Sequence, residues 1–443
     1  MEYNVTKHDT SADVQLIYSL NDIEEAYEKA YLKASKKVKI NGFRPGKAPL
    51  PMVKKVLGES VAEDAINIML SDSINDLYPK LEFKPFREPK IEIEKFERQE
   101  TLVAKAIFEL PPQVTLKNYK KLPLDVFEFE VLEEDIKDQL EKIQFQLSKT
   151  QQKEEGEVVE SKDLLDINIR GLNEEGEEIQ NANNHRYYLG LNLENEDLDK
   201  HFHGMKAGEE KEFPYEYPAD YSNKDLAGKK LKYSVKVNEI FKVILPELDD
   251  AMAKEWNEKF SNLDELKSHL KEELDTSYRR GLEQKYFDKS VNLIMESSDY
   301  KIPASLVKDE MDHIFHKTLH DFRMDHHMSM EEFANIVKVD LSELQKNFED
   351  RALVNLKVYL TIHEIAKLEE IKVSEDELSA EFTKYRENSG ETNFNQGDIE
   401  RILKNIHENI LVDKIMKFLF ENSEKKIESG LSLSRIKEIL NTK

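Results

Sequence analysis

The scarcity of helix-breaking residues in the last part of the chain limits the fold most. Residues 245–443 contain two prolines, Pro246 and Pro303, and four glycines. Ser329 and Ser374 each stand three positions before a glutamate, which is the pattern of a capping box at a helix start. Apolar residues recur at helical spacing, as in the run Leu263, Leu266, Leu270 and Leu274. We therefore expect residues 245–443 to form an elongated all-α domain.

The preceding residues 154–244 have a different sequence pattern, in which short segments of alternating polar and apolar residues are separated by turn residues. The strands that we expect cover residues 165–169, 187–189, 213–215 and 231–237. This pattern predicts a small β-rich domain. The connector before it, residues 113–153, carries a strand-like run at 126–131 and one amphipathic helix, and we expect it to pack with the C-terminal domain.

Residues 1–112 predict a separate α+β domain that ends at the double proline Pro111-Pro112. A strand at residues 14–18 precedes a helix, for which Asn21 and Glu24 form the expected capping box. Ser60 and Glu63 form a second one before a helix that runs to about Tyr78. Two strands close the domain, one around residues 91–93 and one at 102–108. The whole chain is therefore a multi-domain α+β protein.

Charge is distributed unevenly along the chain. The net charge is −25, yet residues 29–58 carry nine Lys or Arg and no Asp or Glu, so the remainder carries −34. Such an acidic chain repels nucleic acid except at this basic segment. No cysteine is present, which excludes disulfides and thiolate chemistry. We find no signal peptide and no apolar run long enough to span a membrane, so we expect a soluble, cytosolic protein.

The middle of the basic segment is a loop, because Gly42, Pro45, Gly46 and Pro49 do not fit within a helix or a central strand. In the loop, Arg44 directly follows Phe43, and Lys47 stands three positions after Arg44. On charge alone, an ordinary basic turn and a docking loop are equally good interpretations. A phosphate-binding P-loop is excluded, because three residues separate the two glycines and Ala48 stands where Ser or Thr is needed.

The loop sequence Gly42-Phe43-Arg44-Pro45-Gly46-Lys47-Ala48-Pro49 resembles the ribosome-docking signature of trigger factor, a family of bacterial ribosome-associated chaperones. Residues 245–250 and 302–311 resemble two motifs of that family's C-terminal domain. The resemblance implies that residues 42–47 bind the ribosome, at a large-subunit protein and rRNA near the exit tunnel. It also implies nascent and unfolded polypeptides as partners, a possible homodimer, no DNA, no membrane and no cofactor.

The resemblance further implies an FKBP-type prolyl isomerase in the middle domain, with related motifs at residues 204–209, 217–221 and 226–229. By position, the pocket walls would be Ile169, Ile179, Tyr187, Tyr221 and Tyr233. The family's apolar pocket floor is replaced here by Asn195-Glu196-Asp197-Leu198-Asp199, which has three carboxylates. A dry pocket favours the twisted X-Pro bond against a barrier of roughly 20 kcal/mol. We therefore expect weak or absent isomerase activity.

Two further clusters of residues each allow a functional interpretation and a purely structural one. Five histidines (His313, His316, His320, His326 and His327) suit a metal face or, more often, a polar surface. Four methionines (Met311, Met324, Met328 and Met330) suit a client-binding surface or simple packing between helices.

No nucleotide motif or catalytic triad pattern is present. The function expected is an ATP-independent, ribosome-docked chaperone. The alternative is a prolyl isomerase, and an RNA-binding module is disfavoured by charge.

Overall fold

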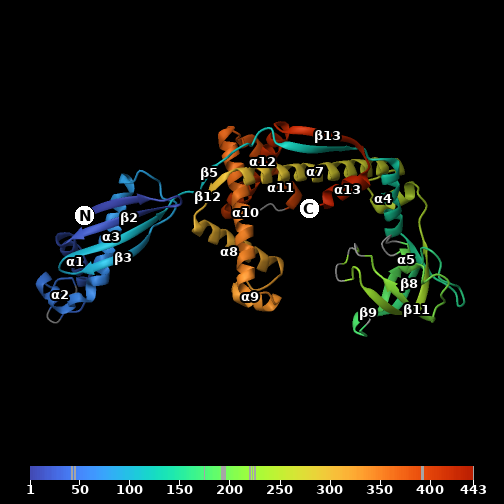
Figure 1. Ribbon diagram of the computed structural model, residues 1–443, viewed down its shortest axis with the longest axis horizontal. Coiled ribbons are helices and arrows are strands. Elements are labelled where there is room, and N and C mark those ends of the chain that lie inside the picture. The colour runs from blue at the N-terminus through green and yellow to red at the C-terminus, as the bar shows by residue number, and fades with distance from the viewer. Residues whose placement is uncertain are drawn as a thin grey trace. The chain divides into compact units, whose positions relative to one another are not determined.

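The computed structural model describes residues 1–443 except 41–42, 44–45, 174, 191–195, 219–220, 222, 224–225, 391–393 and 443. It divides into two compact units, which we describe separately (Figure 1). One unit contains Met1–Val126 and Glu283–Lys426, and the other contains Phe127–Leu282 and Ile427–Lys443. Helices and strands are both abundant, and helices dominate after residue 245, so the predicted fold class is confirmed.

The first unit begins with a four-stranded antiparallel sheet in the order β1-β2-β4-β3. Its strands are β1 (Glu2–Lys7), β2 (Ser11–Ser19), β3 (Lys90–Glu97) and β4 (Thr101–Glu109). Strands β2 and β4 bury every second residue, because helices cover one face of the sheet (Figure 1). These helices are α1 (Leu20–Ser35), α2 (Leu50–Leu57) and α3 (Ala62–Leu77), with short 3₁₀ turns at Gly58–Val61 and Tyr78–Lys80.

The N-cap of helix α1 lies two residues before the predicted one. Ser19 is the N-cap, and its hydroxyl and the Asp22 carboxylate form the capping box, so the Asn21–Glu24 assignment is wrong. The Ser60–Glu63 assignment is also wrong, because a 3₁₀ turn covers Ser60 and α3 begins at Ala62 without a side-chain cap. By contrast, Ser329 with Glu332 and Ser374 with Glu377 form the capping boxes that the sequence predicts.

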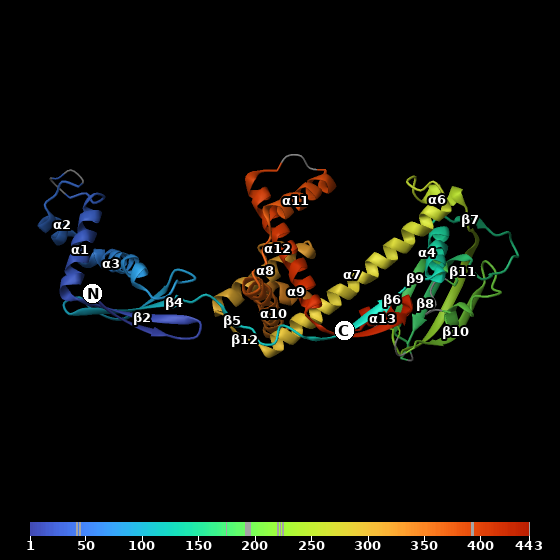
Figure 2. The same ribbon diagram turned by 90° about the horizontal axis from the view of Figure 1, so that it is seen from above.

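The rest of the first unit is mainly helical. Its elements are β5 (Gln113–Thr115), β12 (Asp299–Lys301), α8 (Ala304–Asp321), α9 (Met330–Val337), α10 (Leu341–Leu368), α11 (Glu375–Ser389) and α12 (Gln396–Glu421). One apolar cluster joins α8, α9 and α10, and another joins α10 and α12 to the C-terminal half of α7 (Leu263–Ser297). Helix α11 packs along α12 and buries none of its own residues (Figure 2).

Two strand pairs join residues that are far apart in the sequence. Strand β5 pairs with β12, and β6 (Pro123–Phe129) pairs with β13 (Glu424–Leu431). Strands β12 and β13 therefore add β-structure to a region in which the sequence predicts helices alone. No helix in the described part of the chain is long and apolar enough to cross a membrane.

The second unit contains a five-stranded antiparallel sheet, ordered β10-β11-β8-β9 with β7 paired to the end of β11. Its elements are α4 (Glu133–Gln146), β7 (Lys149–Gln152), β8 (Leu164–Leu172), β9 (Glu178–Tyr188), α5 (Glu196–Asp199), β10 (Glu210–Glu216), β11 (Lys230–Ile244), α6 (Asp250–Trp256) and α13 (Leu433–Asn441). Gly281 on α7 leaves room for Leu440 of α13, since a Cβ there would lie 3.0 Å from the Leu440 side chain.

A buried ion pair fastens the start of this sheet. Lys153 follows β7, and its Nζ donates to Asp163 Oδ2 (2.7 Å), to Glu160 Oε2 (3.0 Å) and to the Val158 carbonyl (3.0 Å). The side chains of Lys153 and Asp163 are 5% and 4% exposed. Asp163 also accepts a hydrogen bond from the Glu160 backbone amide. Its buried carboxylate therefore has hydrogen-bond donors, and its charge is balanced by one buried cation, Lys153.

We predict that Lys153→Met destabilises the sheet of the second unit by about 3–5 kcal/mol, because Asp163 loses its buried cation. Hydrogen exchange of the β8 and β11 amides in the full chain measures this loss. The matched control is Lys232→Met, which removes the exposed pair with Glu212 (63% and 58% exposed) and should cost at most about 1 kcal/mol. Equal losses in the two variants would contradict the prediction.

Candidate functional site

The basic loop is anchored at both ends to the first unit. Ile40, just before the loop, and Ala48, near its end, pack against the apolar core of the sheet and its helices. The Gly46 amide donates to the Ser35 carbonyl at the end of α1 (2.9 Å), and Gly46 adopts φ +77°, which favours glycine. The Phe43 amide donates to the Ile40 carbonyl (3.1 Å), and the ring is 38% exposed. Gly42, Arg44 and Pro45 lie outside the described residues.

Cations around the loop fall into two groups. Lys29, Lys33 and Lys54 form ion pairs with acidic residues of α1 and α3. Five other lysines are exposed, and the described residues provide no ion pair for any of them: Lys36, Lys37, Lys39, Lys47 and Lys55. Positive charge therefore remains available at the surface where α1 ends and α2 begins.

Three exposed apolar residues, in addition to Phe43, lie on the two helices that flank the loop in the sequence. Leu32 on α1 is 54% exposed, and Met52 and Val56 on α2 are 48% and 58% exposed. We did not predict them from the sequence. For Met52 and Val56 the signal was the composition of α2, whose eight residues include more apolar side chains than the burial of Val53 requires. Cations and apolar side chains together suit a partner that has both phosphates and apolar pockets.

The five predicted pocket residues of the second unit occupy different environments. Ile169 and Tyr233 are buried in the core of the sheet. Tyr187 and Tyr221 are half-buried and pack against that core. Ile179 is 37% exposed on β9 and does not belong to the cluster. The structure therefore brings four of the five residues together.

Hydroxyl groups connect several of these rings. Tyr217 and Tyr233 share a hydrogen bond between their hydroxyls (2.7 Å), and the Tyr233 hydroxyl also donates to Gln180 Oε1 (2.6 Å). Burial raises the pKa of both tyrosines, so their phenols stay neutral at physiological pH. Tyr217 was not among the predicted pocket residues, although its ring lies 4.7 Å from that of Tyr221.

The acidic stretch below these rings divides between surface and interior. Asp197 is exposed and pairs with Lys200 (2.5 Å), whereas Leu198 is buried in the apolar cluster. Asp199 is 5% exposed, and it accepts hydrogen bonds from the Tyr187 hydroxyl (2.6 Å) and the Gly190 amide (2.7 Å). Asn195 and the side chain of Glu196 lie outside the described residues. One carboxylate of this stretch thus enters the interior, where two donors satisfy it.

The histidine and methionine clusters lie in the helical part of the first unit. The five histidines are exposed, and no group of three or more His, Asp or Glu within the described ranges is arranged to hold a metal ion. The four methionines are partly buried and pack against the core of α8, α9 and α10. Exposed apolar side chains here include Ile336 on α9 (53%), Tyr359 on α10 (51%) and Phe322 (66%), which directly follows α8.

Comparison with known proteins gives concordant matches. Residues 1–143 match the family described as "Bacterial trigger factor protein (TF)", and residues 262–421 match its C-terminus. Curated relatives include trigger factor of Leptospira interrogans serovar copenhageni, 36% identical over 100% of this chain and 99% of that protein. Trigger factor of Shouchella clausii is 31% identical over 82% of this chain and 83% of its own.

A solved structure also resembles the fold. It was described under "Promiscuous Substrate Recognition in Folding and Assembly Activities of the Trigger Factor Chaperone". The TM-score is 0.51 at 22% identity, over 95% of this chain and 99% of the other.

We predict that Gly171→Ala disturbs the Tyr233 ring. A Cβ at Gly171 would lie 2.8 Å from Cε1 of Tyr233, whose ring is buried and hydrogen-bonded and has little room to move. The expected cost is about 1–3 kcal/mol, with a changed near-ultraviolet circular dichroism signal from tyrosine. Urea unfolding measures the cost. The control is Arg170→Ala at the preceding residue of the same strand. It removes only an exposed ion pair with Glu178, so it should change the free energy of unfolding by at most about 1 kcal/mol. A native signal in Gly171→Ala would refute the prediction.

Proposed function

This chain belongs to the trigger factor family, and on that premise we propose that it is an ATP-independent chaperone that docks on the ribosome through residues 41–49 and holds nascent or unfolded polypeptides. The observation that carries the proposal is the likeness to curated trigger factors over the full length of the chain. We further propose the bacterial cytoplasm as its location, with part of the population bound to ribosomes.

Docking would combine two kinds of contact. The exposed lysines around the loop, such as Lys36, Lys47 and Lys55, suit rRNA phosphates or acidic side chains of a large-subunit protein near the exit tunnel. Phe43 suits an apolar pocket or a base to stack on. The anchoring of Ile40, Gly46 and Ala48 limits the entropy lost when the loop binds.

Client binding would rest on the apolar side chains that the helical part leaves exposed, such as Phe322, Ile336 and Tyr359. Single apolar contacts of this kind are weak, so several are needed at once and each is readily exchanged. Release then needs no nucleotide hydrolysis. We propose that residues 1–112 dock, that residues 113–153 connect, and that residues 245–443 hold clients. Off the ribosome, a second copy of the chain is the further partner that we propose for these surfaces.

The second candidate function is prolyl isomerisation by residues 154–244. The favouring observation is the cluster of Ile169, Tyr187, Tyr221 and Tyr233 around one apolar core. We propose that the activity is weak, because hydroxyl groups and the Asp199 carboxylate occupy an interior that should be dry to favour the twisted amide.

We predict that Phe43→Ala combined with Lys47→Ala abolishes co-sedimentation with ribosomes, and that binding of the native chain weakens steeply as salt increases. Arg44→Ala in place of Lys47→Ala should act in the same way. The matched control is Phe96→Ala with Lys95→Ala on β3, which removes an aromatic ring of similar exposure (36%, against 38% for Phe43) and one cation. Unchanged pelleting of the loop variant would refute the docking assignment.

We predict that the full chain turns over a proline-containing peptide far more slowly than an FKBP-type isomerase measured beside it. Activity equal to that enzyme would disprove the weak-isomerase proposal. A chain in which a short linker replaces residues 154–244 should still protect an unfolded client from aggregation. Loss of protection, with the remaining domains still folded by circular dichroism, would favour isomerisation as the main function.

A further inference from the structure

The segment that joins α8 to α9 is rich in ligands for a soft metal ion. Residues 324–330 read Met-Asp-His-His-Met-Ser-Met, and they follow His320 in the last turn of α8. Thioether sulfur and imidazole nitrogen both suit Cu(I). The chain has no cysteine, so no thiolate competes with these side chains for such an ion.

The backbone at the end of α8 reverses the direction of the chain. Arg323 adopts φ +54°, and the Met324 amide donates to the Leu319 carbonyl (2.8 Å). A left-handed residue followed by this hydrogen bond is a Schellman ending, which returns the chain toward the last helical turn. Met324 accordingly packs against the same apolar cluster as Leu319.

A second turn follows directly. The Asp325 carbonyl accepts a hydrogen bond from the Met328 amide (3.1 Å), and Asp325 Oδ1 accepts one from the His327 amide (2.9 Å). This is a β-turn with His326 and His327 at its two central positions, and the aspartate side chain supports it. Both turns are local, so neighbouring residues fix where these side chains lie.

The two turns bring the rings of His320 and His326 close to each other. Their ring centres are 5.9 Å apart, and the ring planes are tilted by 34°. Two imidazoles that bind one metal ion at N–metal distances of about 2 Å have ring centres roughly 5–6 Å apart. Nδ1 of His320 lies 3.6 Å from Asp321 Oδ1, so we assign its Nε2 to the metal. The His320 side chain is 75% exposed, so an ion reaches it from solvent.

The third ligand has to be a thioether. In the part of the chain that the structure describes, no group of three His, Asp or Glu is arranged to hold a metal ion. Met324 and Met328 stand on either side of the turn that carries His326, and both are only partly buried. Two imidazoles and one thioether favour Cu(I) over harder divalent ions such as Zn²⁺.

We propose that His320, His326 and the thioether of Met324 or Met328 bind one Cu(I) ion. Ag(I) has the same charge and the same preference for soft ligands, and it is stable to oxidation, so it is the probe for this site. The proposal is independent of the ribosome docking and client holding proposed above.

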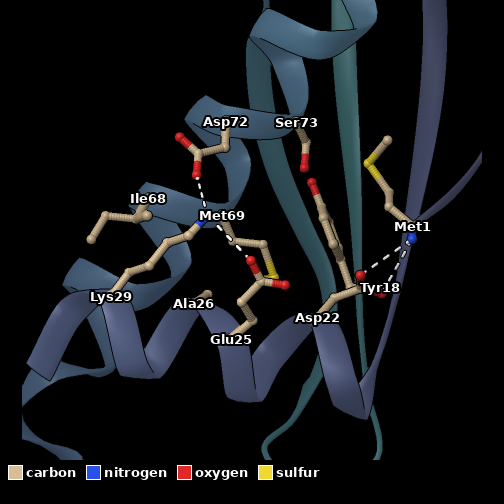
Figure 3. Close-up of a pocket in the computed structure, with 10 residues that line it drawn as sticks. All are labelled: Met1, Tyr18, Asp22, Glu25, Ala26, Lys29, Ile68, Met69, Asp72 and Ser73. Atoms are coloured by element: carbon tan, nitrogen blue, oxygen red, sulfur yellow. Dashed lines mark hydrogen bonds and ion pairs between the residues drawn. The ribbon is translucent and has the colours of Figure 1, made fainter.

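A second pair of methionines provides a comparison within the same chain. Met1 and Met69 line one small cavity between α1 and α3 (Figure 3). The described lining of that cavity contains no histidine, and its carboxylates Asp22 and Asp72 pair with the Met1 amino group and with Lys29. Without imidazole, that cavity lacks the ligand set of the proposed site.

The test uses the full chain with ¹³C-labelled methionine methyl groups, titrated with Ag(I) in a chloride-free buffer. The methyl resonance of Met324 or Met328 should shift and saturate at one equivalent, whereas those of Met1 and Met69 should not move. Loss of a hydrogen-bond partner of a ligand already weakens metal binding about 10- to 100-fold, so His320→Gln and His326→Gln should each cost at least tenfold.

Met324→Leu and Met328→Leu identify the third ligand, because leucine keeps the packing volume and removes the sulfur. One of the two should weaken binding at least about tenfold. The matched controls are Met311→Leu and His313→Gln, which lie nine and seven residues before His320 on α8, roughly 10 Å or more along the helix axis. Both controls should bind Ag(I) as the native chain does.

Four results would overturn the proposal. They are the absence of a shift that saturates at one equivalent, unchanged affinity in either histidine variant, unchanged affinity in both methionine variants, and displacement of Ag(I) by equimolar Zn²⁺. Losses in the Met311→Leu or His313→Gln controls equal to those in the site variants would also overturn it. Circular dichroism of each variant confirms that the helices remain folded.

Discussion

The first unit depends on contacts between chain segments that are far apart in sequence. Strand β5 pairs with β12, and next to it Lys117 exchanges hydrogen bonds with Ser298 (3.1 Å) and Ser297 (3.0 Å), 181 and 180 positions away. The Lys117 side chain also pairs with Asp299 (2.6 Å). Loop-closure entropy grows slowly with length, so closing this loop costs only about 1 kcal/mol more than closing one a quarter as long. A domain can therefore be inserted between the two segments at small thermodynamic cost.

The same distinction between local and distant contacts explains what the sequence predicts well. Strands β2 and β4 were predictable, because one face of each is buried. Apolar residues therefore recur at every second position of a short continuous segment. Strand β1 was missed, because every one of its residues is exposed and it exists only through pairing with β2. Strands β12 and β13 were also missed, because they too exist only through pairing. Their partners β5 and β6 lie so much earlier in the chain that the whole β-rich domain separates them. The cap of α1 was assigned wrongly because two nearby polar residues, Ser19 and Asn21, both fit the capping pattern.

The candidate sites follow this rule too. Glycine, proline and charge identified the loop around Phe43 directly from sequence, whereas Met52 and Val56 were recognised only from the structure, in which α2 buries Val53 and leaves these two side chains exposed. In the second unit, the composition of residues 195–199 indicated a charged floor. It did not indicate that Asp197 would face solvent and that Asp199 would turn inward to Tyr187, because that depends on how α5 sits on the sheet.

The interior of the second unit bears on our proposal that this chain binds peptides there but isomerises them slowly. Hydrogen bonds satisfy the Asp199 carboxylate and the Tyr217–Tyr233 hydroxyl pair, so the apolar cluster tolerates them without a large loss of stability. Rings such as Tyr187 and Tyr221 are only partly buried, so they would still offer apolar area to a peptide. Isomerisation needs more than area, because the twisted amide is favoured only where water and strong dipoles are absent. On that proposal, a polar network that is harmless to folding and to contact would act selectively against the chemical step. A holding chaperone would lose little by that change, because under our proposal its affinity for clients comes from many weak contacts in other domains.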